Sequence, residues 1–143
     1  MKVLFQKIHP EAVLPTYAHA GDAGLDVTSV EEIVIPARGR GMVHTGLRMI
    51  LPSGTEAQVR PRSGLAFRHG VTILNAPGTI DEGYRGELCI LLMNISEVDF
   101  KVEKGMRIAQ LVIAPVLQVE TEETGSVDET VRGTGGFGST GLI

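Results

Sequence analysis

Short segments of alternating apolar and polar residues, separated by glycine and proline turns, run through most of this chain. In residues 98–103, for example, Val98, Phe100 and Val102 alternate with three charged side chains. Alternation with a period of two places one face of a strand against a core and leaves the other face in water. No stretch shows the longer period of an extended amphipathic helix. The sequence therefore predicts an all-β fold, either a sandwich or a barrel.

The same signals give the expected position of each element. Besides residues 98–103, strands are predicted at residues 2–8, 25–30, 32–35, 41–49, 55–60, 71–74, 87–94 and 108–119. Residues 88–93 are apolar on both alternating faces, so we expect either a central strand covered on two sides or a strand at a subunit contact. One short helix is expected at residues 64–69, with Ser63 as its N-cap and Gly70 at its end.

Composition and charge exclude several classes of protein. A chain of 143 residues corresponds to about one domain, and its formal net charge of -4 argues against a protein that binds nucleic acid through a basic face. No apolar run approaches the roughly 18 residues of a membrane helix, so we expect no membrane partner and a cytoplasmic protein. The single cysteine, Cys89, cannot form an intrachain disulfide and is interpreted as a small buried hydrophobe. The four histidines lack zinc-ligand spacing and are interpreted as structural.

The C-terminal segment at residues 132–141 is unusually rich in glycine. It matches G-x-G-x-x-G, but the chain ends before the helix and acidic residue that a dinucleotide site needs, and no Walker A lysine follows. Backbone N–H groups, Arg132 and two hydroxyls could hold phosphate, and Phe137 could cover a flat ring. The alternative is a solvated terminus. We expect a core domain over residues 1–120 and an arm over residues 121–143.

Three other segments carry candidate chemistry. Arginine, serine and glycine at residues 60–64 precede the expected helix, whose N-terminus favours an anion, although an ordinary surface turn explains them equally well. Asp22 and Asp26 enter a strand and could serve either a turn or a magnesium ion that keeps its waters. Residues 75–87 predict a chain reversal with a turn at Pro77 and Gly78 and a second turn after Asp81. Asp81 could be a turn former or a general base.

A further segment, residues 105–110, places an arginine and an amide at a strand start, where an ordinary polar strand edge is the alternative. Together and in chain order, these segments resemble the five motifs of the trimeric dUTPase family, the deoxyuridine triphosphate nucleotidohydrolases. The matching segments are residues 20–27, 61–66, 75–87, 107–112 and 132–141. The resemblance implies a distorted β-barrel or jelly-roll subunit with one short helix and a flexible C-terminal arm. It also implies a homotrimer, with active sites built from motifs of all three chains and each arm closing over a neighbouring subunit's site.

The resemblance further assigns a role to individual residues. Asp81 would activate the water that attacks the α-phosphorus of dUTP, giving dUMP and pyrophosphate, and Asp26 would hold Mg²⁺ through water. This activity would keep uracil out of DNA and supply dUMP for thymidylate synthesis. Arg107 would be a structural or interface partner. The expected substrate-binding residues are Arg62, Ser63, Gly64, Asn75, Gly78, Thr79, Ile80, Tyr84, Gln110, Arg132, Phe137, Gly138, Ser139 and Thr140.

Two other functions fit parts of the same pattern. A dCTP deaminase-like enzyme would share the fold and bind a similar nucleotide, but residues 62–64 and 78–81 look like the dUTPase versions. A non-catalytic nucleotide-binding β-trimer would keep the barrel without the chemistry. The presence of Asp26 and Asp81 argues against that reading.

Overall fold

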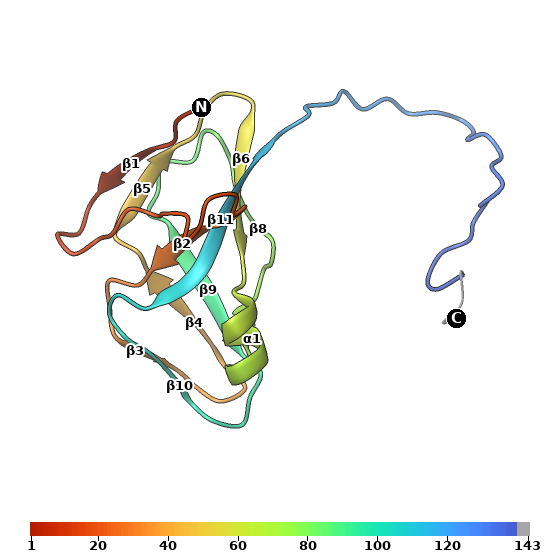
Figure 1. Ribbon diagram of the computed structural model, residues 1–143. Helices are drawn as coiled ribbons and strands as arrows, with labels where there is room; N and C mark the ends of the chain where they lie inside the picture. The colour runs from red at the N-terminus through yellow and green to blue at the C-terminus, as the bar shows by residue number, and fades with distance from the viewer. Residues whose placement is uncertain (140–143) are drawn as a thin grey trace.

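The computed structural model describes residues 1–139, which form antiparallel strands and one short helix (Figure 1). The all-β fold expected from the alternating segments is confirmed. The elements are β1 (Leu4–Lys7), β2 (Leu25–Thr28), β3 (Ile33–Ile35), β4 (Arg40–His44), β5 (Leu47–Ile50), β6 (Thr55–Arg60), α1 (Ser63–His69), β7 (Val71–Ile73), β8 (Gly78–Ile80), β9 (Cys89–Asn94), β10 (Phe100–Val102) and β11 (Arg107–Pro115).

The strands form four small sheets around one core. The two larger sheets have the strand orders β2-β11-β6-β8 and β4-β9-β7, and the pairs β1-β5 and β10-β3 complete the fold. Val27, Ala57 and Leu111 from the first sheet and Val43 and Ile90 from the second all lie in a single buried cluster. Because both sheets bury one face in the same cluster, the subunit is a distorted barrel of the jelly-roll kind, as expected.

Strand β6 shows the alternation most clearly. Thr55, Ala57 and Val59 are buried, while the polar residues between them point outward, and the observed bounds match the prediction. Strand β9 is central in its sheet but buries only one face against the core, because Leu91 on its other face is 37% exposed. The chain alone therefore does not cover this strand on both sides, and its outer face is open to a partner.

The single strand predicted at residues 41–49 is wrong. Strand β4 ends at His44 and β5 begins at Leu47, and the two strands belong to different sheets. The chain breaks at Gly46, which has a φ of 68°. A Cβ atom there would lie 2.5 Å from the Cβ of His9, so the turn depends on glycine.

Two other strand predictions need correction. Gly78 was expected in a turn with Pro77, but it begins strand β8, and the turn lies earlier, at Leu74 and Asn75. The last strand ends at Pro115 rather than at residue 119, because proline has no N–H for the sheet. The second turn after Asp81 is confirmed by a hydrogen bond from Tyr84 N to Asp81 O at 3.0 Å.

Helix α1 begins one residue earlier than expected. Ser63 is its first residue and not its N-cap; that position belongs to Arg62, which makes no capping hydrogen bond through its side chain. Gly70 ends the helix as predicted, in a left-handed conformation with a φ of 64°. None of the helical residues is buried, so α1 lies on the surface of the body.

After β11 the chain leaves the body and runs away from it (Figure 1). Residues 116–139 are exposed except Gly135, which is half-buried by its own neighbours. Arg132 folds back locally, its Nε donating to the carbonyl oxygen of Gly135 at 3.0 Å. No helix within residues 1–139 is long and apolar enough to cross a membrane.

Candidate active site

Strand register brings three of the predicted segments to one place. Across the first sheet, Gln110 on β11 lies opposite Asp26 on β2 and opposite Arg60 on β6. Gln110 Nε2 donates to the carbonyl oxygen of Pro61 at 2.9 Å, which ties β11 to the segment before α1. The result is a polar cavity of about 320 Å³, lined by Ala18, Asp22, Ala23, Gly24, Asp26, Arg62, Ser63, Gly64 and Gln110.

Asp26 is held between two arginines at this cavity. Its Oδ1 lies 3.2 Å from Arg62 Nε, and its Oδ2 lies 3.4 Å from Arg107 Nη1. Arg62 Nη1 also donates to the carbonyl oxygen of Arg107 at 3.0 Å. Arg62 and Arg107 offset the charge of Asp26, and the Arg62 guanidinium is a planar donor that suits phosphate oxygens, while Asp22 adds a second carboxylate to the cavity. Arg107 contacts Asp26 and does not line the cavity, consistent with a structural role.

Gly24 is fixed by steric limits at the same cavity. A Cβ atom on residue 24 would lie 2.1 Å from Oε1 of Gln110, far closer than two such atoms approach. The Gln110 side chain can therefore hold its position only because residue 24 is glycine.

A second cavity, of about 260 Å³, lies beside strand β8 and contains the predicted base-reading residues. It is lined by Met42, Val59, Asn75, Gly78, Thr79, Ile80, Asp81, Tyr84, Glu87, Leu88, Cys89 and Leu91. Tyr84 is fixed in place, because its hydroxyl donates to the carbonyl oxygen of Glu87 at 3.0 Å. A Cβ atom on Gly86 would lie 2.2 Å from that hydroxyl oxygen, so the ring position requires glycine at residue 86.

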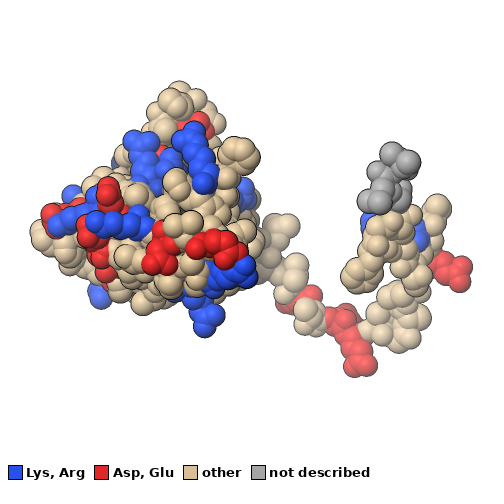
Figure 2. Space-filling model, turned by 90° about the horizontal axis from the view of Figure 1, so that it is seen from below, with Lys and Arg blue, Asp and Glu red and all other residues tan. Residues whose placement is uncertain are grey.

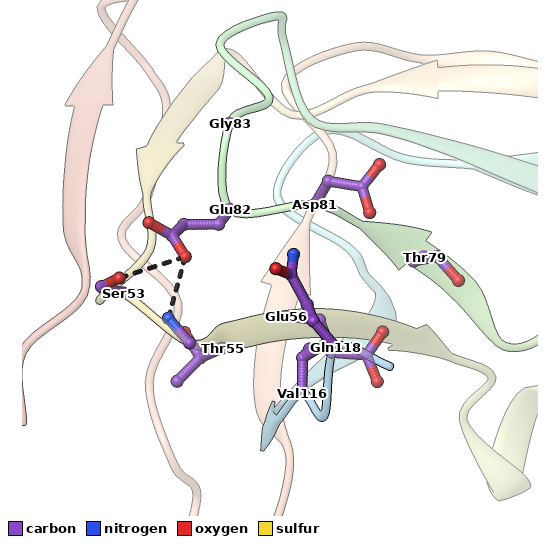
Figure 3. A pocket seen from close by; sticks show the side chains of 10 residues that line it. Ser53, Thr55, Glu56, Thr79, Asp81, Glu82, Gly83, Val116 and Gln118 are labelled. Atoms are coloured by element: carbon purple, nitrogen blue, oxygen red, sulfur yellow. Dashed lines mark hydrogen bonds between the residues drawn. The ribbon is translucent and has the colours of Figure 1, made fainter. Parts of the chain in front are cut away.

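Asp81 directly follows β8 and lines this second cavity and a neighbouring one of about 650 Å³ (Figure 3). The carboxylate of the next residue, Glu82, is already hydrogen-bonded within the fold. Its Oε2 accepts hydrogen bonds from Gly54 N at 2.8 Å and Ser53 Oγ at 3.5 Å. The Asp81 carboxylate points away from that contact. Within residues 1–139 no group donates a hydrogen bond to the Asp81 carboxylate, which leaves it available to a water molecule.

The two polar centres lie far apart in one chain. The cavity that contains Asp26 and the cavity that contains Asp81 share no lining residue. Strands β2 and β8 are the opposite edges of their four-stranded sheet, so three strand spacings, about 14 Å, separate them. An acid that holds a metal through water reaches only about 5 Å. A single chain therefore does not bring Asp26 and Asp81 to the same phosphate.

The predicted arm residues touch neither cavity. Arg132, Phe137, Gly138 and Ser139 are exposed, and the exposed fraction of Phe137 is 115%. None of them lines a cavity in residues 1–139. Thr140 lies outside the described residues. The structure thus brings the predicted residues together as two groups and leaves a third group on the arm.

The model of the dUTPase family matches residues 10–141, nearly the whole chain. The chain belongs to the dUTPase family. The deoxyuridine 5'-triphosphate nucleotidohydrolase of Clostridium novyi is 56% identical over 142 residues, covering 99% of this chain and 100% of that protein. The deoxyuridine 5'-triphosphate nucleotidohydrolase of Clostridium acetobutylicum is 61% identical over 137 residues, covering 96% of this chain and 94% of that protein.

A solved structure in the family has the same fold. The dUTPase of Staphylococcus bacteriophage 80alpha with dUpNHpp superposes with a TM-score of 0.92 at 27% sequence identity, and 99% of each chain is covered. The dUTPase match spans all five of the segments on which the resemblance was based.

Sequence reasoning missed a polar cluster at the wall of the cavity beside β8. His44 Nδ1 lies 3.0 Å from Oε2 of Glu87 and 3.6 Å from Sγ of Cys89, which is half-buried rather than buried as predicted. The hydrogen bond to Glu87 raises the pKa of His44. Burial acts to raise the pKa of Glu87, but hydrogen bonds from His44 and Gly46 outweigh it and lower that pKa. His44 and Cys89 meet because strands β4 and β9 pair. The two residues are 45 positions apart in the sequence, so no local pattern reveals their contact.

Proposed function

We propose that this chain hydrolyses dUTP to dUMP and pyrophosphate. The observation that carries the proposal is the uncommitted Asp81 carboxylate at the edge of the cavity formed by the β8 region. A second cavity, around Arg62, supplies the guanidinium, hydroxyl and backbone N–H donors that phosphate oxygens need. The relatives named deoxyuridine 5'-triphosphate nucleotidohydrolase support this substrate, as does the phage dUTPase with the dUTP analogue dUpNHpp.

Asp81 is the general base in this proposal. Its carboxylate takes a proton from a water molecule, whose oxygen attacks the α-phosphorus while the bond from that phosphorus to the bridging oxygen of pyrophosphate breaks. The group must be free of competing partners, and this condition fits a carboxylate to which no described residue donates a hydrogen bond. Glu82 cannot take this role without giving up its contacts to Ser53 and Gly54.

The charged cavity binds the phosphates. Arg62, Ser63 and Gly64 donate to phosphate oxygens at the beginning of α1, and Gln110 reaches the oxygens nearest the reacting centre. Magnesium, when bound, neutralises negative charge on the triphosphate. Asp26 fits an indirect role toward it, because both its oxygens already pair with arginines, and a bound water can bridge the carboxylate and the ion without displacing either arginine.

The cavity beside β8 selects the base and the sugar. Asn75 and residues 78–80 read uracil, largely through backbone groups whose donor and acceptor pattern cytosine cannot match. The methyl group of thymine is excluded by the tight fit. The fixed Tyr84 ring lies against deoxyribose and leaves no room for a 2′-hydroxyl.

The complete site forms in a homotrimer. Asp81 of one chain meets the Asp26 cavity of a second, which resolves the separation of about 14 Å within a single chain. Met42 and Leu91, exposed side by side on β4 and β9, are apolar surface that a neighbour can cover. Body and arm divide at residues 1–120 and 121–143.

The arm of a third chain closes the site. Arg132, Ser139 and Thr140 grip the γ-phosphate, Gly138 lets the backbone approach, and Phe137 covers the base. Gly138 has a φ of 88°, a conformation that suits glycine. Residues 121–139 form hydrogen bonds only with one another, so the arm gains order from the ligand it covers.

In the cell this reaction keeps uracil out of DNA and supplies dUMP for thymidylate synthesis. We place the protein in the cytoplasm, where its lone thiol stays reduced. No nucleic-acid partner is proposed, because the formal net charge is -4 and acidic side chains lie among the basic ones on the face of the body that Figure 2 shows.

The test is a panel of nucleotides. Purified protein is incubated with dUTP, dCTP, dTTP and UTP, with magnesium or with a chelator, while pyrophosphate and ammonia are followed. Magnesium-stimulated pyrophosphate from dUTP alone is expected, and Asp81→Asn is the matched inactive control. Ammonia from dCTP would identify a deaminase of the same fold, and binding without any turnover would identify a nucleotide-binding trimer.

A further inference from the structure

The cluster of His44, Glu87 and Cys89 is built by strand geometry. His44 on β4 is the direct cross-strand partner of Cys89 on β9. Glu87 precedes Cys89 by two residues, so both side chains lie on the same face of the extended chain. Three different ligand types, a ring nitrogen, a carboxylate and a thiol, therefore converge from two segments, with their ligand atoms within 4.8 Å of one another.

We propose that His44, Glu87 and Cys89 bind a zinc-like divalent metal ion. Tetrahedral zinc with bonds of 2.0–2.3 Å places its ligand atoms about 3.3–3.6 Å apart. The observed 3.6 Å from Cys89 Sγ to His44 Nδ1 already fits, and the 3.0 Å from His44 Nδ1 to Glu87 Oε2 must lengthen by only a few tenths of an ångström.

The ligand set selects the class of metal. Thiolate and imidazole are soft or borderline ligands that favour zinc and cobalt over magnesium and calcium, which prefer oxygen. The site is thus chemically distinct from the oxygen-lined cavity at Asp26. It needs neither nucleotide nor turnover, so it stands independently of the proposed function.

The surroundings give the ion access and compensate its charge. A cavity of about 280 Å³ opens beside the cluster and is lined by Ile8, His9, Val30, Glu31, His44, Gly46 and Glu87. Glu31 faces the same position, since its Oε1 accepts a hydrogen bond from the backbone N–H of His44 at 2.7 Å. Two carboxylates near one thiol favour a cation, and His9 or water can complete the coordination.

Protons compete with the metal at two of the ligands. Coordination replaces the thiol proton and, at lower pH, the imidazole proton, and both protons go to solvent. Metal affinity therefore falls as the pH is lowered.

Cobalt(II) titration of the full-length reduced protein, without nucleotide, tests the site. Because Cys89 is the single cysteine, a thiolate-to-cobalt charge-transfer band can report only this residue. We expect such a band to saturate at one cobalt per chain and to disappear when zinc is added. Absence of the band in the wild-type protein would overturn the proposal.

Three variants sharpen the result. Cys89→Ser should abolish the band, and His44→Gln should weaken cobalt binding by about tenfold or more, with thermal unfolding confirming that both are folded. His69→Gln is the matched control, since His69 packs against Phe100 in a tilted arrangement, with ring centroids 5.2 Å apart, and lies outside the cluster. Cobalt affinity that is the same in His44→Gln and the wild-type protein would also overturn the proposal.

Discussion

The body and the arm of this chain differ in how firmly their side chains are positioned. In the body, Gln110 is fixed by sheet register, by its hydrogen bond to Pro61 and by the absence of a side chain on Gly24. On the arm, Phe137 is fully exposed and Arg132 bonds only to its own turn. Folding therefore places the predicted site residues of the body, whereas the predicted site residues of the arm need a ligand or a partner chain to bring them to a cavity. This difference separates effects on stability from effects on turnover.

The largest expected effect is on the stability of the body. Leu111 is fully buried in the core cluster, so Leu111→Ala should lower the free energy of unfolding by about 2–5 kcal/mol. Val131→Ala, on the exposed arm, is the control and should change it by no more than about 0.5 kcal/mol. Urea unfolding measures both. Equal losses in the two variants would show that the arm packs on the body.

The next largest effect is on the rate of dUTP turnover, with no change in stability. Asp81→Asn should reduce turnover of dUTP by about 10² or more, equivalent to about 2.7 kcal/mol in the barrier, while nucleotide binding and the melting temperature stay unchanged. Asp128→Asn, a carboxylate on the arm outside the predicted site, is the control and should keep full turnover. If Asp81→Asn turned over dUTP at the wild-type rate, Asp81 would not be the general base.

Removing the end of the arm should also reduce turnover without reducing stability, but by a smaller factor than Asp81→Asn. A chain that ends at Val131 loses the predicted phosphate and base contacts, so turnover should fall by about tenfold or more. Its thermal unfolding should match that of the full chain, because residues 132–139 bury nothing in the core. A lower melting temperature in proportion to the lost activity would make the arm a structural strap instead.

The smallest effect is a pH dependence confined to the body. The pKa of His44 is raised above 6.5, so its pairing with Glu87 contributes fully below that value and is lost as the pH rises through the raised pKa. The pKa of Glu87 is lowered below 4.5, so the contribution is also lost as the pH falls through that lowered value.

The two shifts define a window between about pH 4.5 and 6.5 in which the pair stabilises the body. Because His44 is 41% exposed, the gain of wild type over His44→Gln should stay below about 1 kcal/mol. Urea midpoints at about pH 5.5 and about 8.5 measure this difference. A difference that grows at the higher pH would contradict the assigned shifts.

The sequence predicted most of the body because its signals are local. Strand β6 has the expected bounds, and Gly70 ends the helix as predicted. The break at Gly46 was missed because its cause, the nearby Cβ of His9, is 37 residues away in the sequence. Strand β8 was missed because its three residues are too short for alternation to appear.

The same distinction holds for the site. The sequence showed which residue types the predicted site contains and in what order. It did not show which of them lie close together, because that depends on which strands pair. Sheet order shows that Asp26 and Asp81 lie on opposite edges, and pairing of β4 with β9 shows that His44 meets Cys89. Neither fact is encoded in any local pattern.

The central claim is that Asp81 and the Arg62 cavity act together only between chains. Asp81→Asn and Arg62→Ala chains, each inactive alone and each checked by thermal unfolding and light scattering, are to be unfolded, mixed in equal amounts and refolded. In a random mixture three-quarters of the trimers are mixed and each contains one intact pairing, so about a quarter of wild-type dUTP turnover should return. If the mixture stays as inactive as its parents although mixed trimers form, both residues must come from one chain and the account is wrong.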